Sequence, residues 1–327
     1  MSIQNKNAEI IQRNVRKWIS RVGKLDKVKY NKSVISFNDI NVFNSKKRSK
    51  NDTNNKKREN IIGCIINNMM PVEYYKCSLR WSSLKNEIDK YIFTLCADNG
   101  IKDVASIKCE HKAGRGHHYD FNLYINETLN FHIEFKYNAD LLKEAPQFVS
   151  PMKPSQYLTG SYEEFFYDNY FIPVNREFNL PLPTKEEYLK TIHAPDPECV
   201  RQHQEKYYAG CKKSSKFSGD SDDIKFYKHF KKISKESIGS FITENDILIE
   251  KLNNYLLDTQ KGKFYMLYKN KNISLQTINL DDYIITEIKK DPKYSRYIAF
   301  TKTKKKLKIL LRWKNGNGIA FPSFQIS

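Results

Sequence analysis

The 327-residue chain has few of the features that mark membrane or disulfide-stabilised proteins. No apolar run approaches the ~20 residues that a membrane-spanning helix needs. The first residues, MSIQNKNAEI, lack the basic and apolar regions of a secretory signal. The six cysteines include no CxxC pair, and reduced thiols are the default for such a chain. We therefore expect an intracellular protein, cytoplasmic or nuclear, that is not secreted and has no membrane contact.

Acidic residues are also scarce: the chain has 37 Asp and Glu but 56 Lys and Arg. The formal net charge is +19 and the pI is near 9.4. Lysines and arginines near phosphates gain free energy from counterion release, so a nucleic acid is the natural partner. The alternative is a lysine-rich composition with solvated faces. Twenty-one tyrosines and nineteen phenylalanines argue against general disorder.

Three charged residues stand in the segment HHYDFNLYINETLNFHIEFKYN, residues 117–138, which otherwise has the pattern of two core strands. Alternating apolar residues predict a strand before the turn INET and another after it. Glu134 and Lys136 share one face of the second strand, and Asp120 begins the first. Pairing about the turn predicts that Asp120 lies near Lys136, so that the three side chains converge.

Two converging carboxylates suit Mg²⁺, a hard cation that takes oxygen ligands. Such an ion binds phosphate oxygens, lowers the pKa of its water and offsets charge in a phosphoryl transition state. Lys136 would then orient or deprotonate the attacking water, or balance charge at the phosphate. The set Asp120, Glu134 and Lys136 therefore predicts metal-assisted hydrolysis of a phosphodiester.

The pattern Asp-x13-Glu-x-Lys, behind a helix over 77–99 that carries Glu87, resembles the PD-(D/E)XK nuclease superfamily. The resemblance covers about residues 77–170, and Tyr119 stands where the family motif has Pro. It implies metal ligands at Asp120 and Glu134, with Lys136 and Glu87 as further catalytic residues. Gln156, in preference to Gln147, would match the glutamine that often follows the motif.

The resemblance also implies a fold, an α/β (α+β) restriction-endonuclease-like core whose mixed central sheet is flanked by helices. The expected order is helix, three strands and helix, followed by a helical insertion and C-terminal strands. The closing stretch KILLRWKNGNGIAFPSFQIS resembles the C-terminal segment of uncharacterised large-DNA-virus proteins of this kind. The predicted divisions are 1–22 (amphipathic helix), 23–60 (flexible basic linker), 61–175 (nuclease core), 176–258 (mainly helical insertion) and 259–327 (strands packed on the core).

A bare Glu-x-Lys is a weak signal in a lysine-rich chain, and two rivals exist. The first is Glu110-His111-Lys112. The second is Glu287-Ile288-Lys289 with Asp281 and Asp282 upstream. The order of helix, strands and loop favours the Asp120 set. The bland alternative is a surface hairpin with an exposed charged face.

Basic residues flank the predicted site and recur near the end of the chain. In the loop CEHKAGRGHHYD, Gly114 and Gly116 would let backbone approach a phosphate, and Arg115 is a good bidentate ligand for one. The alternative is a solvated basic loop. The residues that we expect at nucleic acid are Lys112, Arg115, His117, His118, Lys304, Lys305 and Lys306.

The N-terminal segment 8–22 has helical apolar spacing with a basic opposite face. The sequence IQRNVRKWISR resembles the calmodulin-binding IQ motif, with Ile11, Gln12, Arg16 and Arg21 as the matching residues. It implies binding of a calmodulin-like protein in the helix-in-groove mode. The alternative is a helix packed on its own domain or lying along DNA. The clusters KKRSK and KKR in 44–60 resemble a bipartite nuclear-import signal, and a solvated linker explains them equally well.

The spacing His193, Cys199, His203 and Cys211 offers zinc-competent ligands. It matches no known finger, so ordinary side chains are the better interpretation. The prediction for the whole chain is a Mg²⁺-dependent endodeoxyribonuclease, with Mn²⁺ as a substitute. A homodimer would suit two-fold cleavage, although no residue indicates one. The alternatives are a non-catalytic nucleic-acid-binding protein of the same fold and a scaffold recruited through the IQ-like helix.

Overall fold

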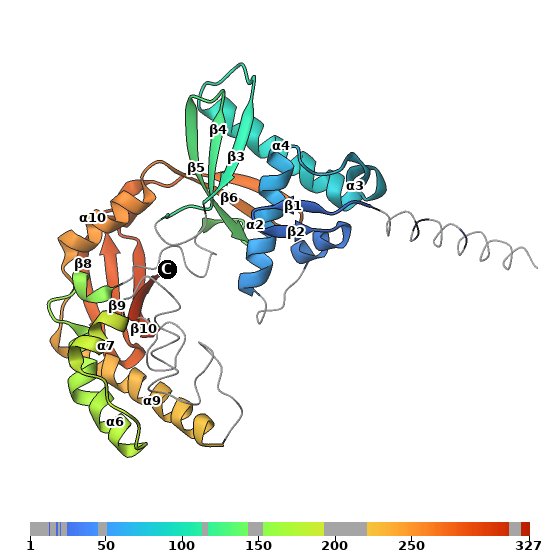
Figure 1. The fold of residues 1–327 in the computed structure, drawn as a ribbon. Coiled ribbons are helices and arrows are strands. Elements are labelled where there is room, and N and C mark those ends of the chain that lie inside the picture. Colours follow the sequence, from blue (N-terminus) through green and yellow to red (C-terminus); the bar gives the residue numbers. More distant parts are fainter. Residues whose placement is uncertain are drawn as a thin grey trace, which may run out of the picture. The chain divides into compact units, whose positions relative to one another are not determined.

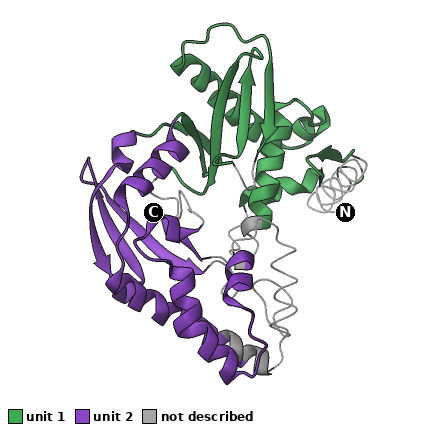
Figure 2. Ribbon diagram, turned by 60° about the vertical axis from the view of Figure 1, so that its left-hand side comes forward, with its two compact units in different colours: residues 1–145, 262–278 green, residues 146–261, 279–327 purple. Residues whose placement is uncertain are grey.

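The computed structural model describes residues 25–44, 51–112, 117–142, 153–192, 221–313 and 322–327, with Arg13, Trp18 and Ser20 before them. The chain divides into two compact units (Figure 2). Unit 1 comprises residues 1–145 and 262–278, and unit 2 comprises residues 146–261 and 279–327. The chain therefore leaves unit 1 after the predicted motif and returns to it for one hairpin.

Unit 1 is built on a five-stranded sheet in the order β3-β4-β5-β6-β7. Strands β5 and β6 are parallel, and the other neighbouring pairs are antiparallel. This is the mixed central sheet that the sequence predicts, and the α/β class is confirmed (Figure 1). The elements of unit 1 are β1 (Val28–Tyr30), β2 (Ser33–Ile35), η1 (Phe37–Asn44), α2 (Asn51–Ile66), α3 (Val72–Cys77), α4 (Leu79–Asp98), β3 (Ile107–His111), β4 (Phe121–Ile125), β5 (Leu129–Tyr137), β6 (Lys263–Lys269) and β7 (Asn272–Gln276).

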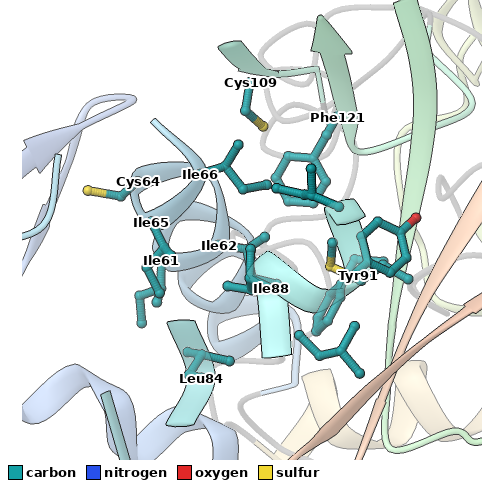
Figure 3. Packing of buried hydrophobic residues seen from close by; sticks show 14 of the residues in the cluster. Ile61, Ile62, Cys64, Ile65, Ile66, Leu84, Ile88, Tyr91, Cys109 and Phe121 are labelled. Carbon is teal, nitrogen blue, oxygen red and sulfur yellow. The ribbon is translucent and has the colours of Figure 1, made fainter. Parts of the chain in front are cut away.

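The main core of unit 1 lies between one face of this sheet and the helices α2 and α4 (Figure 3). Strand alternation places Phe121, Leu123 and Ile125 on that face, and they are fully buried. Helix α4 contributes Trp81 and Ile88, both without exposed surface. Its capping residue Ser78 accepts a hydrogen bond from Arg80 N, as an N-cap should. This face is apolar, so the charged side chains of β4 and β5 lie on the opposite face of the sheet or at the end of the strands.

Helix α2 corrects the prediction that residues 23–60 form a flexible linker. The helix begins in the polar stretch because its second half, Ile61–Ile66, is buried in the core and fixes it there. The polar half is satisfied by specific partners. Arg58 is fully buried, donates to Val42 O from both Nε (3.0 Å) and a terminal nitrogen (2.5 Å), and covers the ring of Tyr137 at 3.4 Å. Lys57 pairs with Asp39 at 2.7 Å.

Unit 2 has its own antiparallel sheet in the order β11-β10-β9-β8, and helix α9 contacts β8, β9 and β10. The Tyr162 hydroxyl joins Ser237 Oγ (2.9 Å) to Trp313 Nε1 (2.8 Å) in its core. The elements of unit 2 are η4 (Pro154–Tyr157), α5 (Tyr162–Phe166), η5 (Tyr167–Phe171), α6 (Ile172–Glu177), α7 (Lys185–Ile192), α9 (Ser221–Glu244), α10 (Ile249–Gln260), η6 (Leu280–Tyr283), β8 (Ile285–Asp291), η7 (Pro292–Tyr294), β9 (Arg296–Thr301), β10 (Lys306–Trp313) and β11 (Pro322–Ile326).

The unit boundaries differ from the predicted ones at two places. Residues 153–175, predicted as part of the nuclease core, form short helical segments of unit 2. Of the predicted C-terminal part, only the hairpin β6–β7 joins the unit 1 sheet, while residues 279–327 belong to unit 2. Of the predicted helical insertion, the described residues contain α7, α9 and α10. Within the described residues, no helix combines the length and apolarity that crossing a membrane requires.

Candidate active site

The register of strands β4 and β5 places Asp120 beside Glu134. Phe121 pairs with Ile133, so one further step sets Asp120 opposite Glu134. Asp120 N donates to Ile133 O at 2.9 Å, and Asp120 Oδ2 accepts a hydrogen bond from Phe135 N at 2.8 Å. The sequence predicted that Asp120 would lie near Lys136. In the structure its cross-strand neighbour is Glu134, two positions earlier in β5. Ile125 pairs with Leu129 around a turn in which Asn126 and Glu127 have positive φ, which fixes the register.

Glu134 lies between two lysine ammonium groups. Lys136 Nζ donates to its Oε1 at 2.5 Å, and Lys263 Nζ donates to its Oε2 at 2.6 Å. All three side chains are largely buried, with 13% of Glu134, 19% of Lys136 and 3% of Lys263 exposed. The predicted convergence of Asp120, Glu134 and Lys136 is therefore present, but a second lysine joins it.

Lys263 was not found by sequence reasoning. It begins β6, and the parallel register with β5 pairs it with His132, two residues before Glu134. The segment KFYMLY was correctly predicted as a strand, but strand periodicity does not tell which strands are neighbours. A buried lysine at the start of an apolar strand was the available signal, since lysine is almost never fully buried without a partner.

Glu59 of helix α2 is the acidic residue that a helix places near this site. Its carboxylate acts electrostatically on both Asp120 and Lys136, and its Oε2 lies 3.0 Å from His111 Nε2. Glu87 of α4, predicted for this role, is elsewhere: its Oε2 accepts from Ile273 N of β7 at 3.0 Å. The structure thus brings together Asp120, Glu134 and Lys136 with Glu59, and uses Glu87 to hold the opposite edge of the sheet.

The charges of the cluster shift one another's pKa values. Burial, together with the nearby carboxylates of Glu134 and Glu59, raises the pKa of Asp120 to about 8. Burial would raise the pKa of Glu134 as well, but the two lysines outweigh it and lower that pKa. Burial opposes the charge of Lys136, but Glu134 outweighs it and raises the pKa of Lys136. The pKa of Lys263 is lowered by burial, although Glu134 acts against this.

The donor set suits one divalent cation. No group of three His, Cys, Asp or Glu side chains arranged to hold a metal occurs in the described part of the chain. Mg²⁺, however, is typically held by one or two carboxylates, with water and substrate phosphate completing its shell. Asp120 and Glu134 lie side by side, and burial together with the carboxylates of Glu134 and Glu59 raises the pKa of Asp120. A cation bound to both carboxylates would favour their charged forms.

Histidines and a tyrosine lie around the cluster. Tyr119 stacks on His132 with ring centroids 4.1 Å apart, and the His117 ring contacts Tyr119 at 5.6 Å. Burial and the neighbouring Lys263 lower the pKa of His118. His117 and His118 thus lie beside the cluster, and their role at nucleic acid stays a prediction. Lys112 forms an ion pair with Glu110 at 3.1 Å, and Arg115 lies outside the described residues.

Four further predicted residues belong to unit 2 and not to unit 1. Gln156 lies in η4, and Lys304, Lys305 and Lys306 lie at the β9–β10 turn, so all four belong to unit 2. Lys305 is paired with Asp282. The rival pair Glu287 and Lys289 is a surface ion pair at 3.2 Å with more than half of each side chain exposed.

Several predicted residues fall outside the described part of the chain. These are Gln147, the IQ-like residues Ile11, Gln12, Arg16 and Arg21, and the zinc-competent residues His193, Cys199, His203 and Cys211. The cysteines Cys64, Cys77, Cys96 and Cys109 are free thiols. Comparison with protein families, with curated proteins and with solved structures found no match to this chain.

Proposed function

We propose that this protein is a Mg²⁺-dependent nuclease that hydrolyses phosphodiester bonds of DNA. The observation that carries the proposal is the buried cluster of Asp120, Glu134 and Lys136 at the end of the β4–β5 hairpin. Buried carboxylates and lysines are costly to desolvate, so such a cluster in a sheet otherwise built on apolar packing suits a chemical role. The net charge of +19 suits an anionic polymer as the substrate.

Each residue has a part in this proposal. Asp120 and Glu134 would hold the metal ion, which supplies an activated water and neutralises charge on the phosphate when it is bound. Lys136, held as an ammonium by Glu134, would orient the attacking water or the phosphate rather than remove a proton. Lys263 would stabilise the charge that develops on the phosphate oxygens. Glu59 would position the cluster through Asp120, Lys136 and His111.

One observation favours a second function, a nucleic-acid-binding protein that does not cleave. Both Glu134 oxygens already accept hydrogen bonds from lysines. A cation would have to displace or share these contacts. If Lys263 is never displaced, the cluster is a structural ion network, and the basic chain binds DNA without hydrolysing it.

Cleavage of supercoiled plasmid separates the two functions. The purified protein is incubated with Mg²⁺, with Mn²⁺ or with EDTA, beside Asp120→Asn, Lys136→Ala and the control Lys289→Ala on the exposed β8 pair. The nuclease proposal requires metal-dependent nicking that both site variants abolish and the control retains. Equal DNA binding by all four proteins, with no cleavage of plasmid, single-stranded or branched DNA under any condition, would establish the binding function instead.

A further inference from the structure

Unit 1 contains a pocket of about 420 Å³ where the parallel strands β5 and β6 end. Ligand sites in proteins typically have about 300–1,000 Å³. Ligands of α/β sheets commonly bind at the carboxyl ends of parallel strands. The pocket is lined by Phe43, Asn44, Tyr137, Asn138, Tyr268, Lys269, Asn270 and Lys271. It therefore has the size and the place of a small-ligand site.

The aromatic part of the lining is held rigidly. Tyr137 and Tyr268 stack with ring centroids 5.6 Å apart, and Phe43 contacts Tyr268 at 5.0 Å. Arg58 covers the Tyr137 ring from α2, and the Tyr137 hydroxyl donates to Phe43 O at 2.8 Å. Phe43 and Tyr268 are only 5% and 6% exposed, so these rings form a packed floor of the pocket that needs no ordering when a ligand binds.

The rim of the pocket is polar and basic. The amides of Asn44, Asn138 and Asn270 and the ammonium of Lys271 are exposed. Each asparagine amide can both donate and accept a hydrogen bond, which is what the edge of a nucleobase requires. Lys269 pairs with Asp140 at 2.7 Å, while Arg80 and Lys271 line the adjoining hollow, which shares Phe43 and Tyr268. The balance of charge favours an anionic group beside the aromatic rings.

The pocket is close to the candidate active site along the chain. Asn138 follows Lys136 by two residues, which is about 7 Å along a strand. Asn138 N donates to Tyr268 O at 2.6 Å, so the end of β5 is tied to the end of β6. Lys136 and Tyr137 are consecutive in β5, so their side chains point to opposite faces of the sheet, and the cluster and the pocket share a strand but not a face.

We propose that this pocket binds one unpaired nucleotide, with its base against the tyrosines and the three asparagines and its phosphate at Lys271. This deepens the proposed function and rests on it for the substrate class, which becomes single-stranded DNA or a nucleotide turned out of a duplex. A base that is still paired and stacked in a duplex cannot enter a pocket of this size without leaving its stack.

Calorimetric titration of the full-length protein with the four deoxynucleoside monophosphates tests the pocket directly, in EDTA so that cleavage plays no part. Asn138 and Asn270 have φ of 63° and 51°, so Asn138→Gly with Asn270→Gly removes both amides without backbone strain. We expect about tenfold weaker nucleotide binding by this double variant. Lys271→Gln should reduce the advantage of a nucleotide over its nucleoside. The matched control is Lys102→Gln, an exposed lysine elsewhere in unit 1.

Three results would overturn the proposal. If inorganic phosphate binds as tightly as the nucleotides, or if the double variant binds them as wild type does, the pocket is an anion site at most. Displacement of the mononucleotide by a single-stranded oligonucleotide, but not by its blunt duplex, is expected, and absence of displacement would refute the assignment to a DNA strand. Repeating the titration with Asp120→Asn keeps the two proposals apart, since the pocket should bind nucleotides whether or not the protein cleaves DNA.

Discussion

Lys263 on β6 donates a hydrogen bond of 2.6 Å to Glu134 on β5, a residue 129 positions earlier in the chain. This contact crosses the parallel strand pair of the unit 1 sheet. It links the hairpin that carries Asp120 to the segment that returns from unit 2. The candidate active site is therefore assembled only when the distant hairpin β6–β7 has joined the sheet.

Replacing Lys263 tests how strongly the cluster depends on this link. Lys263→Met keeps the length of the side chain but leaves Glu134 buried with only Lys136 as an ion partner. Removing one member of a buried pair costs about 3–5 kcal/mol, and because Lys136 remains we expect about 2–4 kcal/mol in the free energy of unfolding. Urea denaturation in EDTA measures this difference.

Lys269→Met is the matched control on the same strand, because Lys269 pairs with the exposed Asp140. Exposed ion pairs contribute about 0–1 kcal/mol, so this variant should unfold almost as wild type does. Equal losses in the two variants would show that Lys263 stabilises β6 by its position alone and not through Glu134.

The binding of Mg²⁺ should respond to the same lysine. A metal at Asp120 and Glu134 competes with Lys263 for Oε2 of Glu134, so Lys263→Met should bind Mg²⁺ more tightly than wild type. Ligands that bind only the native state raise Tm in proportion to their occupancy. We expect the Mg²⁺-induced rise in Tm to be largest for Lys263→Met and smallest for Asp120→Asn. Identical shifts for all three proteins would place the metal somewhere else.

Local sequence pattern was sufficient for the strands of unit 1. Phe121, Leu123 and Ile125 alternate with polar residues, and the predicted strand β4 is present with the predicted face in the core. The pairing of β4 with β5 followed from the short turn. The exact neighbour of Asp120 did not, because one residue more or less in a turn moves every cross-strand partner.

Helix α2 and the role of Lys263 could not be predicted from the sequence, for a different reason. The polar half of α2 has no apolar periodicity, and its helix is held by contacts that arise only in the folded unit, such as Arg58 with Val42 O and the Tyr137 ring. The parallel pairing of β5 with β6 is a long-range property, since unit 2 lies between them in the chain. Glu59 was missed together with its helix, and Glu87 was chosen in its place.

The roles of Glu59 and Glu87 can be separated by the same conservative change. Glu59→Gln removes a charge that acts on Asp120 and Lys136, so we expect cleavage to fall by about 10–100-fold, as is common for outer-shell partners. Glu87→Gln keeps an oxygen for the Ile273 N–H and should leave cleavage within about twofold, since a neutral acceptor replaces a charged one far from the cluster.

Initial rates of plasmid nicking over a range of Mg²⁺ concentrations make this comparison. A positioning role for Glu59 predicts a shift in the Mg²⁺ dependence as well as in the maximal rate, which a loss of folded protein alone would not produce. The reverse order, with Glu87→Gln the more damaging change, would restore the original prediction for α4.

The Asp39 carboxylate gives unit 1 a stability that depends on pH. It accepts hydrogen bonds from Ser36 N (2.8 Å), Ser36 Oγ (2.9 Å) and Lys57 Nζ (2.7 Å). Burial raises the pKa of Asp39, but the hydrogen bonds from Lys57 and Ser36 outweigh it and lower that pKa below its usual value. The folded state therefore binds the proton less readily than the unfolded state does. The stability that Asp39 contributes is complete above the unfolded pKa of about 3.9. It is lost as the pH falls through the lower pKa of the folded state.

We expect Asp39→Asn to lower the free energy of unfolding by about 1–2 kcal/mol at pH 7, because neutral hydrogen bonds replace charged ones. The difference from wild type should shrink below about pH 4. Urea titrations of both proteins between pH 7 and pH 3 measure it, with Asp103→Asn as an exposed control. If the difference in unfolding free energy between the two proteins stays constant down to pH 3, the destabilisation comes from altered packing around Ser36 and Lys57 and not from the charge of Asp39. A difference that disappears at low pH would show that the charge of Asp39 stabilises the contact between Asp39 and Lys57 of α2.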